Sequence, residues 1–495
     1  MISMGHGDTH VHADLRTDVI IVGGGLAGIS CALGLRGSGL NVMLFEESGS
    51  PGGRARSWID GKSGDLIDLG AYAIHSECIN LLALLRQLGT HKRIVWQADR
   101  LIRLIGKDRF VAGNTAPALP NLRVGLANVP RPGLRRSFSS NALLWLALRL
   151  EEEGIEQLDD LCAIELLRRH HVGPRAIKGP WTSICLSLLG VPPERCSACA
   201  LMRVYAQLIR HRGCRMGFAD CGLAPLYLPA ALQSLRAAGT RVQLRSKVVA
   251  LIYQGGIARG VVLADGTRIC ASHCIMTVPP LALSNLLPAR CRARTPFIDA
   301  HAFESAPRVC VYLWLDRKLT RKCFWVRARS ENFLNCQFYD LSNIRAGWRE
   351  RSSVIAGNIM CAHRAERMSD REIIDATTLE LAADIPQMRG AKILHAVVNR
   401  IPMAVLCPAP GTERKRPDAY TAVPGLLLAG DWTRTHLPAC MDSAVRSGWL
   451  AAERVWSSLG RPRSLAPPTR PSEGLAGLVQ RYAMRKTHAR PELVA

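Results

Sequence analysis

The sequence predicts an α/β fold in which a parallel sheet is interrupted by an inserted α+β domain. A β-branched run that ends in glycines opens a strand–helix–strand unit at residues 17–48. Strand-like segments return at 240–280 and again at 425–431, whereas residues 91–215 mix Pro-rich stretches with amphipathic helical ones. A chain of 495 residues is long enough for two domains of this kind.

The opening unit is read from three consecutive segments. "TDVIIVGGG" has the composition of a buried parallel strand, "LAGISCALGLRGSG" is a small-residue helix with glycines at its end, and "NVMLFEES" is a second strand. Together they form one βαβ unit of about thirty residues.

The junction between the first strand and the helix fits the pattern G-x-G-x-x-G. Gly23 allows a tight turn, Gly25 lets a pyrophosphate approach the backbone, and Gly28 lets the helix pack closely on the strand. Glu46 ends the second strand, where its carboxylate is placed for a ribose diol. We therefore expect an adenine dinucleotide at the helix N-terminus, bound by Gly23, Gly25, Leu26, Ala27, Gly28 and Glu46.

The later elements follow from periodicity and turn residues. Helices are expected at 79–90 and about 229–238, and four strands between 241 and 271, the last three separated by turns at Gly255-Gly256 and Asp265-Gly266. "RVCVYLWLD" is a further strand, and Ser369 with Glu372 predicts a capping box. "GLLLAGD" is the last strand, and a long helix follows it.

Composition narrows the classes of partner. The formal net charge of +24 either reflects scattered arginine or marks an anionic partner such as a phospholipid surface. No nucleic-acid motif is present, so we expect no nucleic acid. The 17 cysteines follow no apolar leader, which predicts a reduced cytoplasmic protein. Cys196 and Cys199 form one CxxC, too little for a zinc site, so no metal is expected.

Two further motifs indicate which dinucleotide binds. "PGGRARSW" follows the second strand and resembles the second FAD motif of the amine-oxidase superfamily, and "LAGDWTRTHLPACMDSAVRSG" resembles its C-terminal flavin motif. The resemblance implies FAD as cofactor and a Rossmann-like domain of the amine-oxidase/glutathione-reductase type. By the same resemblance Val248 touches the adenine, and the further FAD contacts are Gly53, Arg54, Gly430, Asp431 and Met441.

The resemblance also implies how the chain is divided. Residues 1–16 are a flexible tail, and 461–495 are a peripheral basic tail. The FAD-binding domain is discontinuous and comprises 17–90, 216–285 and 405–460, and the substrate domain comprises 91–215 and 286–404.

Within that superfamily the chain is most similar to enzymes that act on polyisoprenoids. "WTSICLSLLGVPPERCSA" resembles the hydroxysqualene dehydroxylases, and "DREIIDATTLELAADIP" resembles the plant-type phytoene desaturases. We expect dehydroxylation of hydroxysqualene to squalene by hydride from reduced FAD. Phytoene or carotenoid desaturation, small-amine oxidation and flavin binding without turnover are the alternatives, and the electron partner stays open.

Two positions depart from the usual pattern of these families. Tyr72 stands where a histidine is usual, in "IDLGAYAIHS", and Asp442 replaces a glutamate before the last helix. Tyr72 and His75 are candidates for an acid near a leaving oxygen, although packing alone also explains them. The catalytic residues are therefore left unassigned.

A long hydrocarbon substrate suggests an enzyme that lies on a membrane. No apolar stretch is long enough to span one. Arg131, Arg135, Arg136 and Trp145 flank an apolar run, which predicts a peripheral contact with the anionic inner face of the membrane. A core helix with the same spacing is the alternative.

Overall fold

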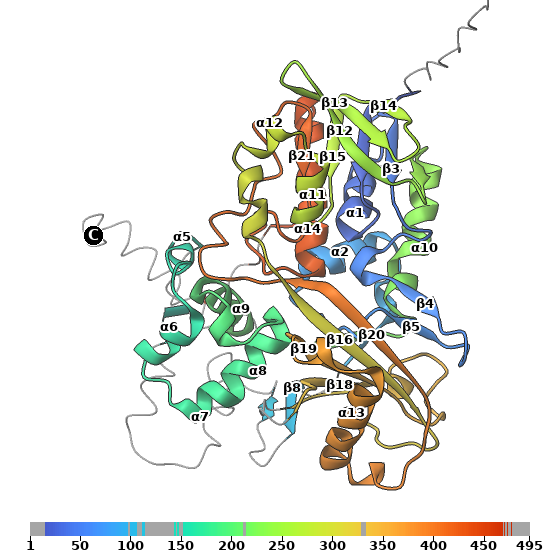
Figure 1. Cartoon of the computed structure of the whole chain (residues 1–495), viewed down its shortest axis with the longest axis vertical. Helices are drawn as coiled ribbons and strands as arrows, with labels where there is room; N and C mark the ends of the chain where they lie inside the picture. Colours follow the sequence, from blue (N-terminus) through green and yellow to red (C-terminus); the bar gives the residue numbers. More distant parts are fainter. Residues whose placement is uncertain are drawn as a thin grey trace, which may run out of the picture.

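The computed structural model describes residues 15–97, 100–105, 111–113, 143–144, 146–147, 152–210, 214–327, 333–468, 470, 473 and 477. Figure 1 shows two large sheets, one at each end of the molecule, with a group of short helices beside the second. The predicted membrane-contacting residues Arg131, Arg135, Arg136 and Trp145 lie outside the described residues.

The first sheet is five-stranded and entirely parallel, in the order β11-β3-β2-β15-β21. Its strands are β11 (Arg241–Gln243), β3 (Val42–Phe45), β2 (Val19–Val22), β15 (His273–Met276) and β21 (Leu426–Leu428). The chain leaves β2 toward β3 on one side and later returns to β15 on the other. This makes the carboxyl end of β2 a topological switch point, where such sheets bind ligands.

Both faces of this sheet are covered, which explains its unbroken apolar strands. Val19 and Ile21 pack toward the helices of one face, and Ile20 and Val22 toward a layer of antiparallel strands. The helices are α1 (Leu26–Gly34), α2 (Ile79–Gln87), α10 (Leu223–Ala237) and α14 (Met441–Ser458). The antiparallel strands of this layer are β12 (Val248–Gln254), β13 (Ile257–Leu263) and β14 (Arg268–Cys270), and β1 (Leu15–Arg16) pairs in parallel with β14 at its edge.

The helices α1 and α14 pack at very short range because both carry small residues. A Cβ on Gly448 would lie 2.2 Å from the carbonyl oxygen of Ala27, and one on Gly34 would lie 2.9 Å from the Cβ of Ala452. The small residues of "SAVRSG" are therefore a packing requirement as much as a cofactor motif.

The second sheet has seven strands in the order β20-β16-β19-β18-β17-β8-β9. They are β20 (Ile393–Leu406), β16 (Ser305–Leu315), β19 (Val354–Met360), β18 (Gln337–Asp340), β17 (Phe324–Arg327), β8 (Arg100–Ile105) and β9 (Val111–Gly113). Helix α13 (Asp370–Asp384) covers one face (Figure 1). Its predicted capping box is confirmed: Ser369 Oγ accepts from the Glu372 N–H, and the Glu372 carboxylate accepts from the Ser369 N–H.

Short elements complete the described part of the chain. The helical group consists of α5 (Glu152–Glu156), α6 (Ala163–Arg169), α7 (Pro174–Ala176), α8 (Thr182–Ile184) and α9 (Ala198–Arg210). The other short strands are β4 (Ser57–Ile59), β5 (Leu66–Asp68), β6 (Ile74–His75), β7 (Ile94–Trp96) and β10 (Met216–Ala219). Helices α11 (Pro280–Leu286) and α12 (Ala289–Arg292) follow β15.

One predicted boundary is wrong. Helix α10 begins at Leu223 and not near Pro229, which lies inside it. Pro225 sits in the first turn, where an N–H has no intrahelical partner in any case, so it does not stop the helix. Pro229 costs one backbone hydrogen bond, and the buried side chains of Leu226, Tyr227 and Leu228 on the same turn compensate.

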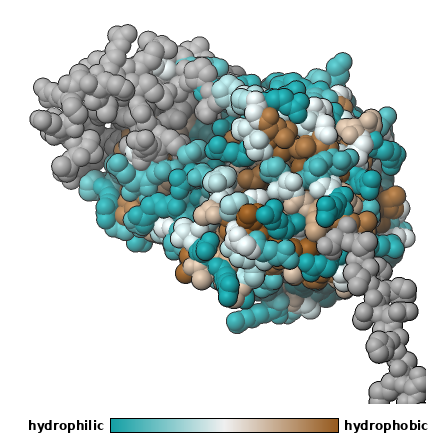
Figure 2. Space-filling view, turned by 90° about the horizontal axis from the view of Figure 1, so that it is seen from above, coloured by the Kyte–Doolittle hydropathy of each residue, from teal (hydrophilic) through white to brown (hydrophobic). Residues whose placement is uncertain are grey.

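Figure 2 shows, on the face seen from above, small groups of hydrophobic side chains among hydrophilic ones. Within the described ranges no helix is both long and apolar enough to cross a membrane.

Candidate functional site

The turn after β2 is built by glycines that tolerate no side chain. Gly23 has φ +111°, and a Cβ there would lie 2.6 Å from Thr277 Oγ1. The Thr277 hydroxyl donates to the backbone here: its oxygen lies 2.8 Å from the Val22 carbonyl oxygen and 3.0 Å from the Gly23 carbonyl oxygen. A Cβ on Gly28 would lie 2.0 Å from the Gly23 carbonyl oxygen. The turn is therefore tight, and α1 starts directly against it.

Gly25 differs from these two glycines. Its φ of −74° is open to any residue, and a Cβ there would meet no protein atom within 4 Å. Gly25 is the N-cap of α1, and no side chain caps this helix end. The first-turn N–H groups, including those of Leu26 and Ala27, therefore border open space beside a helix N-terminus, which fits a pyrophosphate group.

Glu46 follows β3 directly and is largely buried. Its carboxylate accepts from the Gly24 N–H at 2.8 Å and from the Ser48 N–H and hydroxyl at 2.9 and 2.6 Å. A carboxylate offers about four acceptor sites, so one remains for a ribose hydroxyl. Glu46 thus also ties the turn to the end of β3.

The structure brings the second and third cofactor motifs together. Arg54 Nη2 lies 2.6 Å from Asp431 Oδ1, an ion pair between residues 377 positions apart. A Cβ on Gly53 would lie 3.4 Å from the Gly25 Cα, which places this motif beside the first turn. Gly430 has φ +139°, and its N–H donates to Ser447 Oγ on α14 at 2.8 Å.

Two predicted FAD contacts lie further out. Met441 is the first residue of α14, and the N-cap of that helix, Cys440, makes no side-chain cap. Val248 begins β12 and packs in one cluster with Val22, Met43 and Phe45, beside the adenine end predicted from the sequence. The roles of all the predicted contacts as FAD ligands stay predictions.

Asp442, the shorter acid that departs from the family pattern, has a structural role. One of its oxygens accepts from the Leu81 N–H at 2.8 Å and the other from Asn80 Nδ2 at 3.0 Å. Asp442, in the first turn of α14, therefore accepts a hydrogen bond from a backbone N–H in the first turn of α2 that has no partner within that helix. Burial raises the pKa of this carboxyl to about 6, although the two hydrogen bonds act in the opposite direction.

This pKa predicts a pH-dependent stability. The folded chain holds the Asp442 proton to higher pH than the unfolded chain, whose pKa is near 3.8. The free energy of unfolding therefore falls as the pH rises from about 4 to about 6, by up to about 3 kcal/mol from this group. Urea unfolding across this range should show that fall in the wild type and not in Asp442→Asn. Parallel pH curves for the two proteins would contradict the assignment.

The loop that carries Tyr72 lies between the cofactor motifs and the seven-stranded sheet. The guanidinium carbon of Arg308 lies 4.8 Å from the centre of the Tyr72 ring, and Tyr72 is also close enough to Arg54 to interact with its charge. His75 instead contacts Cys214, with Nε2 2.8 Å from Sγ. Tyr72 is thus the better placed of the two predicted acid candidates.

The sheet holds this loop through side chains on its inner face. Asn358 Nδ2 donates to the Ala71 carbonyl at 2.7 Å, Tyr312 Oη to the Asp68 carbonyl at 2.8 Å, and Asn399 Nδ2 to the Leu69 carbonyl at 3.2 Å. Sequence reasoning missed these residues and Arg308. The sequence could have indicated them, because charged and polar residues stand there within apolar strands, and a polar side chain that is buried needs a hydrogen-bond or charge partner.

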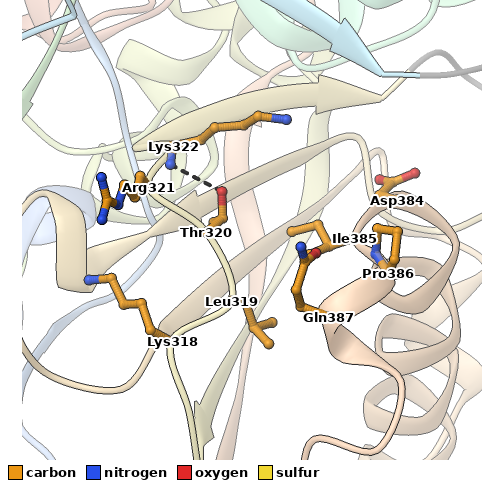
Figure 3. Close-up of a pocket in the computed structure, with 9 residues that line it drawn as sticks. All are labelled: Lys318, Leu319, Thr320, Arg321, Lys322, Asp384, Ile385, Pro386 and Gln387. Atoms are coloured by element: carbon orange, nitrogen blue, oxygen red, sulfur yellow. Dashed lines mark hydrogen bonds between the residues drawn. The ribbon is translucent and has the colours of Figure 1, made fainter.

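Other features lie apart from this site. A cavity of about 460 Å³ lies between the loop after β16 and the C-terminal end of α13 (Figure 3). Its walls are Lys318, Leu319, Thr320, Arg321, Lys322, Asp384, Ile385, Pro386 and Gln387. Cys196 and Cys199 are buried free thiols. In the part of the chain that the structure describes, no three His, Cys, Asp or Glu side chains are grouped as for a metal ion.

Known proteins resemble the chain over most of its length. A 15-cis-phytoene desaturase of Solanum lycopersicum is 25% identical over 452 residues, which cover 88% of this chain and 77% of the relative. A 15-cis-phytoene desaturase of Synechococcus elongatus is 23% identical over 465 residues, which cover 88% of this chain and 95% of the relative. Putrescine oxidase bound to putrescine has the same fold, with a TM-score of 0.69, 17% identity, and coverage of 90% of this chain and 100% of the other.

A family model decides the assignment. The model described as flavin containing amine oxidoreductase matches residues 26–456, which include the cofactor motifs except Gly23, Gly24 and Gly25 of the turn. The open cradle at Gly25 fits the cofactor of that family. The chain therefore belongs to the flavin-containing amine oxidoreductases, and its cofactor is FAD.

Proposed function

We propose that this FAD-dependent oxidoreductase desaturates a long polyisoprenoid of the carotenoid type. The observation that carries the proposal is the similarity to phytoene desaturases of a plant and a cyanobacterium over 88% of the chain. These relatives favour desaturation over the dehydroxylation of hydroxysqualene that the sequence motifs suggested. The likeness to putrescine oxidase supports the fold alone.

The described residues suit this class of reaction. FAD, when bound, supplies the acceptor or donor of a hydride. The chain must then hold the cofactor, exclude water and position an apolar substrate. Phe218, Phe324 and Tyr339 form an aromatic cluster on the inner side of the seven-stranded sheet, with ring centres 4.8 to 6.0 Å apart. These rings are buried in the core of that side of the sheet and make it apolar.

The positive charge of Arg308 distinguishes between the two alternative functions, small-amine oxidation and dehydroxylation. An amine substrate would be a cation, and it would approach the buried guanidinium of Arg308, so like charges disfavour small-amine oxidation. Dehydroxylation of hydroxysqualene is the second candidate, because Tyr72 and Arg308 place hydrogen-bond donors beside the predicted flavin site. A leaving oxygen needs such donors.

Expression in hosts that accumulate phytoene or hydroxysqualene tests the proposal. We expect lipid extracts of the phytoene host to contain carotenoids with additional double bonds. A chain that cannot hold FAD, such as Gly25→Val, is the control and should leave phytoene unchanged. Squalene in the hydroxysqualene host would instead establish the second candidate. Unchanged lipids in both hosts would refute the polyisoprenoid proposal.

A further inference from the structure

Arg308 is a buried cation that has no acidic partner among the residues that the structure describes. Its residue is 6% exposed, and its Nε has no hydrogen-bond partner. The other buried arginines in the described ranges all face carboxylates: Arg203 pairs with Glu156 and Glu413, Arg327 with Asp384 and Glu380, Arg345 with Asp68, and Arg416 with Glu413. A buried charge normally has such a partner, so Arg308 is the exception that needs an explanation.

The position of Arg308 points it toward the predicted flavin site. Residues two apart on a strand share a face, so Arg308 lies on the side of β16 that carries Cys310 and Tyr312, which face the Tyr72 loop. Its cross-strand neighbours are apolar, Met360 on β19 and Ile401 on β20. Within the described ranges, the contact that offsets its charge is the Tyr72 ring.

The Tyr72 ring is itself held in place. A Cβ on Gly70 would come within 3.3 to 3.4 Å of the ring carbons and the hydroxyl, so the ring folds back over this glycine. The backbone on either side of Gly70 is bound to the sheet by Asn399 and Asn358. Guanidinium and phenol are thus held together on a constrained loop and a central strand, as a preorganised pair of donors.

We propose that Arg308 and Tyr72 form a receptor for an oxygen-bearing group of the substrate, a hydroxyl or a carboxylate. The inference rests on the proposed function and ranks its substrates: a polyisoprenoid that carries an oxygen group should bind here more tightly than a hydrocarbon such as phytoene. The guanidinium offers five N–H donors, and a carboxylate accepts two of them in parallel. A pure hydrocarbon would leave the guanidinium buried without an acceptor, and sites built to bind a polar group reject analogues that lack it.

Ligand binding to the FAD-loaded protein tests this receptor without turnover. The probes are geranylgeranoic acid, geranylgeraniol, the hydrocarbon with the same skeleton, and benzoate, each titrated while the visible spectrum of the flavin is followed. We expect the acid and the alcohol to bind at least about tenfold more tightly than the hydrocarbon. Arg308→Met should remove this preference and the binding of benzoate, whereas Arg308→Lys should retain part of it as a point charge.

A matched control lies on the same sheet. Arg400 on β20 is the cross-strand partner of Val309, so its side chain lies on the opposite face, where it pairs with Asp370. Arg400→Met should leave all four affinities unchanged. Tyr72→Phe should weaken binding of the alcohol more than that of the acid, because the carboxylate keeps its contact with Arg308.

The outcomes separate this inference from the proposed function. If the hydrocarbon binds as tightly as the acid, the polyisoprenoid proposal stands and the oxygen receptor is refuted. If benzoate binding depends on Arg308 but no isoprenoid binds, the receptor stands and the polyisoprenoid proposal falls. If Arg308→Met is purified without FAD, the arginine serves the cofactor and the inference is overturned. Arg308-independent binding of every oxygen-bearing probe also overturns it.

Discussion

Gly25→Val is expected to weaken FAD binding by at least about 100-fold, or about 2.7 kcal/mol, while the chain remains folded. The backbone of Gly25 has φ −74° and ψ −179°, which valine adopts readily. The added side chain meets no protein atom within 4 Å, so it fills the space that the pyrophosphate needs. Purified variant should lack the flavin absorbance, also after FAD is added, and should unfold in urea like the wild-type apoprotein.

Gly28→Val separates cofactor binding from folding. The Cβ there would lie 2.0 Å from the Gly23 carbonyl oxygen, so the start of α1 must move away from β2. Overpacking of this kind costs about 1–3 kcal/mol or more, and this variant should lose both stability and FAD. If Gly25→Val destabilised the apoprotein as much as Gly28→Val, or retained yellow flavin, the cradle at Gly25 would be wrongly assigned.

The second large effect is expected at Glu413, which lies buried between two arginines. Its carboxylate pairs with Arg203 on α9 and, at 2.9 Å, with Nε of Arg416. Arg416 Nη1 in turn donates to the Asp431 carbonyl at 3.0 Å. Glu413→Ala leaves two buried guanidinium groups short of a counter-charge, which should lower the free energy of unfolding by about 3–5 kcal/mol.

Urea unfolding followed by circular dichroism measures this loss. Glu413→Gln keeps the shape and removes the charge, so it should recover part of the loss through hydrogen bonds alone. Asp375→Ala on α13 is the matched control, because its ion pair with Arg371 is solvent-exposed and should contribute less than about 1 kcal/mol. Equal losses for Glu413→Ala and Asp375→Ala would show that the buried network does not stabilise the fold. Because Arg416 supports the Asp431 backbone, FAD retention should fall together with stability.

The features that sequence reasoning identified correctly are local ones. The glycine turn, the βαβ unit, the hairpin turns at Gly255-Gly256 and Asp265-Gly266 and the capping box at Ser369 each depend on residues within a few positions. The predicted start of α10 near Pro229 was wrong, because Pro229 lies inside the helix, where buried neighbours offset its lost hydrogen bond. Predictions from local sequence fail where the tertiary surroundings change the free-energy cost of placing a residue in a helix or strand.

The contacts that join distant segments could not be predicted in this way. The Arg54–Asp431 pair spans 377 positions, and the Asp442 bond to Leu81 spans 361. Nothing in the residues around Arg308 shows whether a carboxylate will approach it, since that depends on which strands become neighbours. That Arg308 lacks a carboxylate partner among the described residues becomes clear only when it is compared with the other buried arginines of those ranges.

By itself, the sequence determined the α/β class, FAD as the cofactor and the superfamily, because glycine positions and apolar periodicity act over short distances along the chain. The tertiary structure decided which groups meet: Arg54 with Asp431, Glu413 with two arginines, and Arg308 with the ring of Tyr72. The physical reason is that the free energy of a buried charge depends on every group around it. Those groups come from segments that only the packed fold brings together.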